Sequence, residues 1–218
     1  MRALRLLWSF SCGETFEAFF SSPYKAFERE RERSESRNET NEKLTFPFSS
    51  RTPPQKKRFI HKSNHCPFVV LLKDALVALA REYTPKFVKI VGISSNSAET
   101  HPQDGPAAMR DDAEKLGYAA AGFRYLFDET QEIAKEFRAA CTPEFYVFDS
   151  RGRLFYHGQF DDARPANGVA PSGADVRSAL DDVLSGREEV SRKPVKRSLG
   201  CNIKWAPGNE PSYFHTVG

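Results

Sequence analysis

The sequence lacks long apolar runs, and this absence excludes several classes of protein. No apolar stretch among the 218 residues approaches the roughly 20 residues that a membrane helix needs, so we predict no membrane-spanning segment. Glycine and proline number 13 and 14 and follow no fixed period, which excludes a collagen-like chain. Apolar residues make up 39% and charged residues 28% of the chain. This length and composition predict one globular domain with an appended segment.

The chain also has little concentrated charge of one sign. Lysine and arginine number 32 and aspartate and glutamate 29, which gives a formal net charge of +3. Residues 1–65 hold 13 basic and 8 acidic side chains, so the remainder is faintly acidic. Neither part carries the basic stripe that is typical of nucleic-acid-binding proteins, and we therefore predict no nucleic-acid partner.

Cysteine is sparse, and its spacing is uninformative for metal binding. Cys12, Cys66, Cys141 and Cys201 are all at least 54 residues apart, and no two form a Cys-x-x-Cys pair. This excludes a zinc finger or ribbon and a disulfide-rich secreted scaffold, and we predict no metal site. Isolated thiols suit a reducing compartment, where each is either inert and buried or reactive. We therefore predict an intracellular, most simply cytoplasmic, protein.

Residues 1–58 are predicted to form a poorly structured arm. Charge alternates over residues 28–35, and residues 49–58 are rich in serine, proline and lysine, as in a linker. We expect residues 1–50 to be mobile and to be cleaved early by proteases. Arg2 and Arg5 stand among leucines with no acidic residue before Glu14, a pattern that is also compatible with organelle targeting.

Regular secondary structure is predicted from residue 66 onwards. Apolar spacing predicts helices over residues 67–83 and 106–116, the second ended by Gly117. Thr130 and Ser172 are the predicted caps of two further helices. Strands are predicted over residues 87–93, 125–127, 145–148 and 154–160. The last two form a hairpin, and the whole order predicts an α/β sandwich with a mixed sheet.

Three motifs resemble a known superfamily. Ser63-Asn64-His65-Cys66-Pro67 begins the first helix, Cys141-Thr142-Pro143 leads into the hairpin, and Gly200-Cys201-Asn202-Ile203-Lys204-Trp205 lies near the end. Together with the element order they resemble the thioredoxin-like superfamily, more closely its peroxiredoxin-related branch of alkyl hydroperoxide reductase/thiol-specific antioxidant (redoxin) proteins. The resemblance covers about residues 64–211. It implies a three-layer α/β/α sandwich with a mixed central sheet over residues 59–190, followed by a tail over residues 191–218.

The sequence departs from this family at two places. Ser63 stands where the family has the first cysteine of its active-site pair. Residues 56–62 stand where the family has an apolar central strand, yet only Phe59 and Ile60 suit a buried strand. Nothing upstream resembles the family's opening strands, so N-terminal strands are expected to be missing. Either the domain is divergent, or the first 60 or so residues do not belong to it.

Cys66 is the predicted reactive thiol. It lies in the first turn of a predicted helix, where free N–H groups and the helix dipole favour the nucleophilic thiolate, and a protonated His65 adds positive charge. Ser63 excludes a disulfide within the motif, and Ser63-x-x-Cys66 fits the hydroxyl that the resemblance implies before a peroxide-attacking cysteine. Ser63 is otherwise a helix-capping hydroxyl without a catalytic role. Cys141 is either a second thiol partner or a packing residue.

Pro143 is predicted to follow a cis peptide bond, because the resemblance implies one at this position. The backbone of Thr142 then lies beside Cys66, where an extended substrate segment could form hydrogen bonds. Thr142, Pro143 and His65 are the predicted substrate groove. The alternative is an ordinary trans proline that opens a strand.

The resemblance implies a thiol-dependent oxidoreductase or antioxidant in which Cys66 reduces peroxides or disulfides. It implies no cofactor, and its partners would be a peroxide or disulfide substrate and a thiol reductant of the thioredoxin or glutathione type. The alternative is a redox-inactive thioredoxin-fold module that binds a partner through the groove at Pro143, since Ser63 replaces the first cysteine.

Overall fold

The computed structural model of the chain describes residues 56–191 and 194–216. The predicted mobile arm over residues 1–50 and its targeting segment lie outside the described residues, as does Cys12. Within the described part, no helix is both long and apolar enough to cross a membrane.

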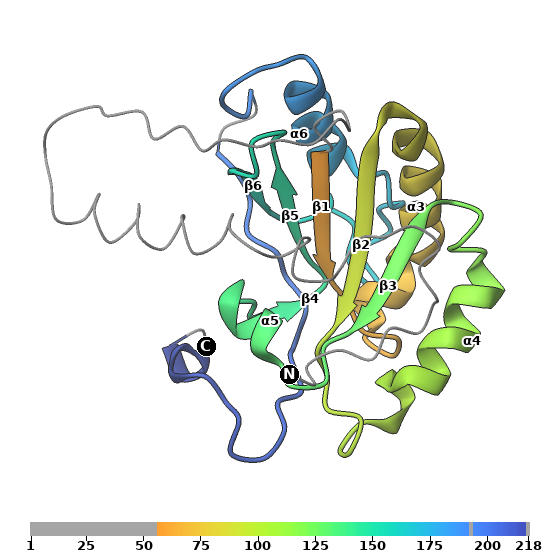
Figure 1. Cartoon of the computed structure of the whole chain (residues 1–218), viewed down its shortest axis with the longest axis vertical. Helices are drawn as coiled ribbons and strands as arrows, with labels where there is room; N and C mark the ends of the chain where they lie inside the picture. Colours follow the sequence, from red (N-terminus) through yellow and green to blue (C-terminus); the bar gives the residue numbers. More distant parts are fainter. Residues whose placement is uncertain (1–55, 192–193, 217–218) are drawn as a thin grey trace, which may run out of the picture.

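The described residues form a mixed, five-stranded sheet in the order β3-β2-β1-β5-β6 (Figure 1). Its strands are β1 (Lys56–His61), β2 (Val88–Ser94), β3 (Phe123–Phe127), β5 (Glu144–Phe148) and β6 (Leu154–Gly158). β1, β2 and β3 run parallel, while β5 is antiparallel to β1 and β6 antiparallel to β5. The predicted mixed sheet with a closing hairpin is thereby confirmed.

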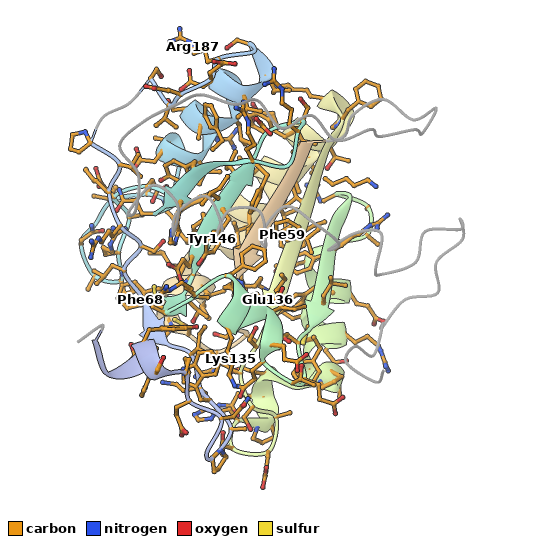
Figure 2. The ribbon with its side chains drawn as sticks, turned by 60° about the vertical axis from the view of Figure 1, so that its left-hand side comes forward. Phe59, Phe68, Lys135, Glu136, Tyr146 and Arg187 are labelled. Carbon is orange, nitrogen blue, oxygen red and sulfur yellow. The ribbon has the colours of Figure 1, made fainter. Side chains whose placement is uncertain are left out.

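β1 is the central strand, although its sequence predicts a weak one. It pairs with β2 on one side and β5 on the other, so that Phe59 lies opposite Val91 and Tyr146. Figure 2 shows the Phe59 and Tyr146 side chains on these neighbouring strands. The strand is therefore present, and its end is buried too, since His61 is 1% exposed.

Three helices pack on one face of the sheet. They are α3 (Pro67–Tyr83), α4 (Pro106–Leu116) and α6 (Ala174–Leu184), with the short 3-10 turns η1 (Thr84–Lys86) and η2 (Pro102–Asp104) beside them. α3 directs Leu72, Leu76 and Leu79 into a core shared with Ile60 and Ile90 of the sheet. The bounds of α3 and α4 are those that the apolar spacing predicts, and Gly117 ends α4 at a φ of +66°.

The opposite face is covered by α5 (Glu132–Glu136) and by the tail, which ends in η3 (Ser212–Thr216). Ile203 and Trp205 of the tail are buried with Phe59, Ile133 and Phe137 in a second core. In Figure 1, α5 lies at the lower left of the sheet and α3 on its right. Helices and tail on the two faces enclose the sheet, which confirms the α/β sandwich.

Of the two predicted helix caps, one is incomplete and the other is wrong. At α5 the Thr130 hydroxyl accepts the N–H of Glu132 at 3.5 Å, but the Asp128 carboxylate accepts two further N–H groups, those of Ile133 at 3.4 Å and Ala134 at 3.0 Å. α6 begins after Gly173, and Ser172 makes no capping hydrogen bond to it. A buried carboxylate satisfies free N–H groups more strongly than a hydroxyl, and its place depends on the tertiary structure.

A second, two-stranded sheet joins the middle of the chain to the tail. β4 (Cys141–Thr142) pairs antiparallel with β7 (Cys201–Asn202), and Thr142 lies directly opposite Cys201. Gly200 permits this approach, since a Cβ at that position would lie 2.0 Å from the carbonyl oxygen of Thr142. The pairing brings the tail to the end of the main sheet.

Candidate active site

Cys66 begins α3 and is completely buried. It is the N-cap of the helix rather than a residue of its first turn, and its carbonyl accepts the N–H of Val70 at 2.9 Å. Its side chain is 0% exposed, and its thiol donates a hydrogen bond to the carbonyl oxygen of Thr142 at 3.1 Å. The structure therefore brings together two of the predicted site residues that are 76 positions apart.

Ser63 lies beside Cys66 and organises the backbone there. Its hydroxyl oxygen accepts the N–H of Cys66 at 3.3 Å and lies 3.5 Å from the hydroxyl of Thr142. Ser63 thus holds the backbone N–H of the N-cap residue, whereas the free N–H groups in the first turn of α3 receive no side-chain cap. All three side chains are buried.

The peptide bond between Thr142 and Pro143 is cis, as the resemblance implies. The backbone edge of Thr142 does not lie open, however, because β7 pairs with it. The position where the sequence analysis places an extended substrate is therefore occupied by the chain's own tail. Thr142 is 3% exposed as a result.

The thiols of Cys66, Cys141 and Cys201 come together where β4 pairs with β7. Cys201 enters on β7 opposite Thr142, and Cys141 lies on β4 beside it. Burial raises the pKa of Cys201 above its ordinary value, and a hydrogen bond with Cys66 acts in the same direction. Burial, followed by the charge of Glu144, raises the pKa of Cys141 to about 12. Cys141 and Cys201 are therefore protonated at neutral pH.

His65 faces a buried carboxylate. Its Nδ1 lies 2.5 Å from Oδ2 of Asp104, and its ring stacks on His101 with the ring centroids 5.5 Å apart. The sequence predicts a charge effect of His65 on Cys66 and a place for His65 in the groove. In the structure, the His65 side chain contacts Asp104 and His101.

Asp104 fixes the loop that carries the active-site motif. Its Oδ1 accepts the backbone N–H groups of Asn64 at 2.7 Å and His65 at 3.3 Å, and the side chain is fully buried at the end of η2. Asn96 donates to Oδ2 at 2.7 Å and also accepts the N–H of Lys204 in the tail at 2.9 Å. Asn96 and Asp104 therefore connect the motif loop to the tail.

A family model for AhpC/TSA proteins matches residues 59–157. This range contains the motif of Cys66, the cis proline and most of the central sheet. The chain belongs to the AhpC/TSA family. It therefore has the thioredoxin-like fold and belongs with thiol-based redox proteins.

Two solved structures are similar to the chain over most of their length. A hypothetical protein from Sinorhizobium meliloti 1021 is 43% identical, with a TM-score of 0.68 over 72% of this chain and 82% of its own. An uncharacterized conserved protein from Geobacillus kaustophilus is 47% identical, with a TM-score of 0.66 over 71% of this chain and 79% of its own. The comparison with curated proteins finds no match.

Sequence reasoning missed three residues of this AhpC/TSA site, namely Cys201, Asp104 and Asn96. The signal for Cys201 was the adjacent Gly200, because glycine in an extended segment often marks a close backbone approach. Asp104 and Asn96 carried no signal, since their role depends on loops that meet only in the fold. Within residues 56–191 and 194–216, no group of three or more His, Cys, Asp or Glu side chains could hold a metal ion.

Proposed function

We propose that the protein is a thiol peroxidase in which Cys66 reduces a small hydroperoxide. The observation that carries this proposal is the placement of Cys66. It is a thiol at the start of a 17-residue helix, next to the Ser63 hydroxyl and beside the cis proline of an AhpC/TSA domain. The sulfur thus lies at the positive end of a helix dipole and near its free N–H groups, and cysteine attacks a hydroperoxide through its thiolate.

The burial of Cys66 supports a small peroxide, rather than a disulfide on another protein, as its oxidant. The sulfur is buried, and the backbone edge beside it is paired with β7. A disulfide carried on another protein would reach Cys66 only after β7 had separated from β4. A hydroperoxide with a small substituent needs far less space.

The chemistry requires two electrons and balances as follows. The Cys66 sulfur attacks the terminal oxygen of the hydroperoxide, the O–O bond breaks, and Cys66 becomes a sulfenic acid. The proton that the thiol donates to the Thr142 carbonyl in the resting state leaves with the alcohol or water product. Two electrons from external thiols, of the thioredoxin or glutathione type, then return Cys66 to the thiol and release water.

The alternative function, a redox-inactive binding module, has less support. It requires the backbone edge at Pro143 to receive an extended partner. That edge is already paired through Thr142 and Cys201, and Gly200 fits closely against the Thr142 carbonyl. A partner would have to displace the tail.

The test is hydroperoxide consumption by the purified full-length protein with dithiothreitol as electron donor. We expect turnover of hydrogen peroxide and loss of that turnover in Cys66→Ser, because serine forms no sulfenic acid. Cys12→Ser, which changes a cysteine outside the described site, is the matched control and should keep the activity. Equal consumption by the wild type and Cys66→Ser would contradict the proposal.

A further inference from the structure

The tail presents a cysteine to the active site from far along the chain. Cys201 is the cross-strand partner of Thr142, and directly opposed residues in an antiparallel pair project their side chains from the same face. The Thr142 hydroxyl on that face lies 3.5 Å from Ser63, and the Thr142 carbonyl accepts the Cys66 thiol. The register therefore directs Cys201 towards the site of Cys66.

The tail is held firmly in this position. Gly200 fits against the Thr142 carbonyl where any Cβ would clash, and Ile203 and Trp205 are buried at 2% and 7% exposure. The Lys204 N–H bonds to Asn96 at 2.9 Å, and the Lys204 carbonyl accepts the Ser97 N–H at 2.8 Å. Contacts on both sides of Cys201 thus fix its place.

We propose that Cys201 is the resolving thiol, which forms an intramolecular disulfide with oxidised Cys66. The step rests on the proposed peroxidase reaction. The Cys201 sulfur attacks the sulfur of the Cys66 sulfenic acid, the S–O bond breaks, and an S–S bond forms. The hydroxyl leaves with the Cys201 proton as water, so Cys66 is reduced and Cys201 is oxidised.

Ser63 leaves the active-site motif without a second thiol of its own. A cysteine at position 63 could resolve Cys66 locally, but a hydroxyl forms no disulfide. β7 lies where an extended substrate would pair beside the cis proline, so the tail delivers Cys201 in the manner of a bound substrate.

Cys201 is better placed for this role than Cys141. Cys201 lies directly opposite Thr142, whose carbonyl accepts the Cys66 thiol, whereas Cys141 is one position along β4 from Thr142, and successive side chains of a strand project to opposite faces. Cys201 and Cys141 are both partly exposed, while Cys66 is fully buried. An external thiol would therefore reach the disulfide from the Cys201 side.

The experiment maps cysteine oxidation in the full-length protein after one equivalent of hydrogen peroxide, by mass spectrometry of unreduced peptides. The wild type and Cys141→Ser should both contain a Cys66–Cys201 disulfide. Cys201→Ser should lack it and should accumulate Cys66 sulfenic acid, which dimedone traps. Near-ultraviolet circular dichroism before oxidation checks that Cys201→Ser keeps the packed fold.

The outcomes separate the two proposals. A Cys66–Cys141 or Cys66–Cys12 disulfide in the wild type, or equal dimedone labelling of Cys66 in the wild type and Cys201→Ser, overturns the role of Cys201 and leaves the peroxidase intact. Absence of any Cys66 oxidation in Cys201→Ser overturns the peroxidase. A parallel sample of the wild type is then treated with diamide, which oxidises dithiols without peroxide. A Cys66–Cys201 disulfide in that sample supports the pairing of these two thiols, and its absence overturns the pairing.

Discussion

Two basic residues at the end of β1 are buried in different ways. His61 packs its ring edge-on against Phe137, with the centroids 5.3 Å apart, and burial lowers its pKa to about 4. Lys62 is 0% exposed, lies 3.6 Å from the centre of the Tyr125 ring and donates to the Tyr118 hydroxyl at 3.1 Å. Neutral histidine behaves as an aromatic ring, whereas lysine carries a charge that needs partners.

Lys62 should make the stability of the protein depend on pH. Burial lowers its pKa from 10.5 to about 7, although Asp112 at 3.5 Å opposes this effect. Between these two values the unfolded chain binds more protons than the folded one. The free energy of unfolding therefore rises with pH across this range, by up to about 1.4 kcal/mol per pH unit. Below pH 7, Lys62 is protonated in both the folded and the unfolded chain, so it adds no pH dependence there.

Lys62→Met should remove that slope, because methionine does not titrate. Urea unfolding from pH 6 to 9 should show the wild type gaining stability relative to Lys62→Met above pH 7. Lys73→Met is the control, since it removes another cation from Asp112 at a partly exposed position. Parallel curves for the wild type and Lys62→Met would show that Lys62 stays charged when folded.

At the scale of elements, β1 depends on few apolar side chains. Phe59 is 5% exposed and contacts Phe137 and Phe148 edge-on, with the ring centroids 5.2 and 5.5 Å apart. It thereby joins the central strand to α5 and β5. A strand with only two apolar residues in its sequence concentrates its packing energy in those residues.

Phe59→Ala should lower the free energy of unfolding by about 3–5 kcal/mol, because it leaves a cavity under the central strand. Phe87→Ala removes the same atoms from a side chain that is 71% exposed, and should change stability by less than about 0.5 kcal/mol. Denaturant unfolding of both variants measures the difference. Similar losses in the two would mean that β1 is not a main source of stability.

The elements also show how far the sequence could be interpreted. α3 and α4 were predictable to the residue, because their apolar spacing, first-turn prolines and terminal glycine act locally. β1 looked too polar, since the partners that accommodate His61 and Lys62 come from distant elements. β7 could not be predicted, because two residues carry no periodicity. Its pairing with β4 depends on Gly200 fitting against a backbone far away in the sequence.

The same limit applies to the site. The sequence identified Cys66, Ser63, Thr142 and Pro143, since one motif and one Thr-Pro pair carry them. The structure brings all four together. The sequence could not reveal that the tail pairs with the backbone edge of Thr142, because that pairing depends on where the residues after α6 return to the sheet.

At the scale of the whole molecule, the tail closes the second face of the sheet, and Gly200→Ala should loosen it. The added Cβ would lie 2.0 Å from the Thr142 carbonyl oxygen, so β7 must move away from β4. Trp205, which is 7% exposed, should then become more exposed. In a Trp8→Phe background, its fluorescence emission should shift to longer wavelength.

Gly186→Ala is the control for this variant. Gly186 has a φ of +81° and open space around it, so alanine there costs about 1 kcal/mol of backbone strain and touches nothing. Its Trp205 emission should match that of the parent. An unchanged emission in Gly200→Ala would show that the tail accommodates the methyl group without leaving β4.

The pairing of β4 with β7 also has a consequence during synthesis. A ribosome adds about 5–20 residues per second, so several seconds separate the making of Thr142 from that of Cys201. In that interval the nascent chain contains an unpaired strand edge next to Cys66, and such edges readily take up other extended segments. The tail, once made, fills this edge from within the same chain, where its local concentration exceeds that of any competitor.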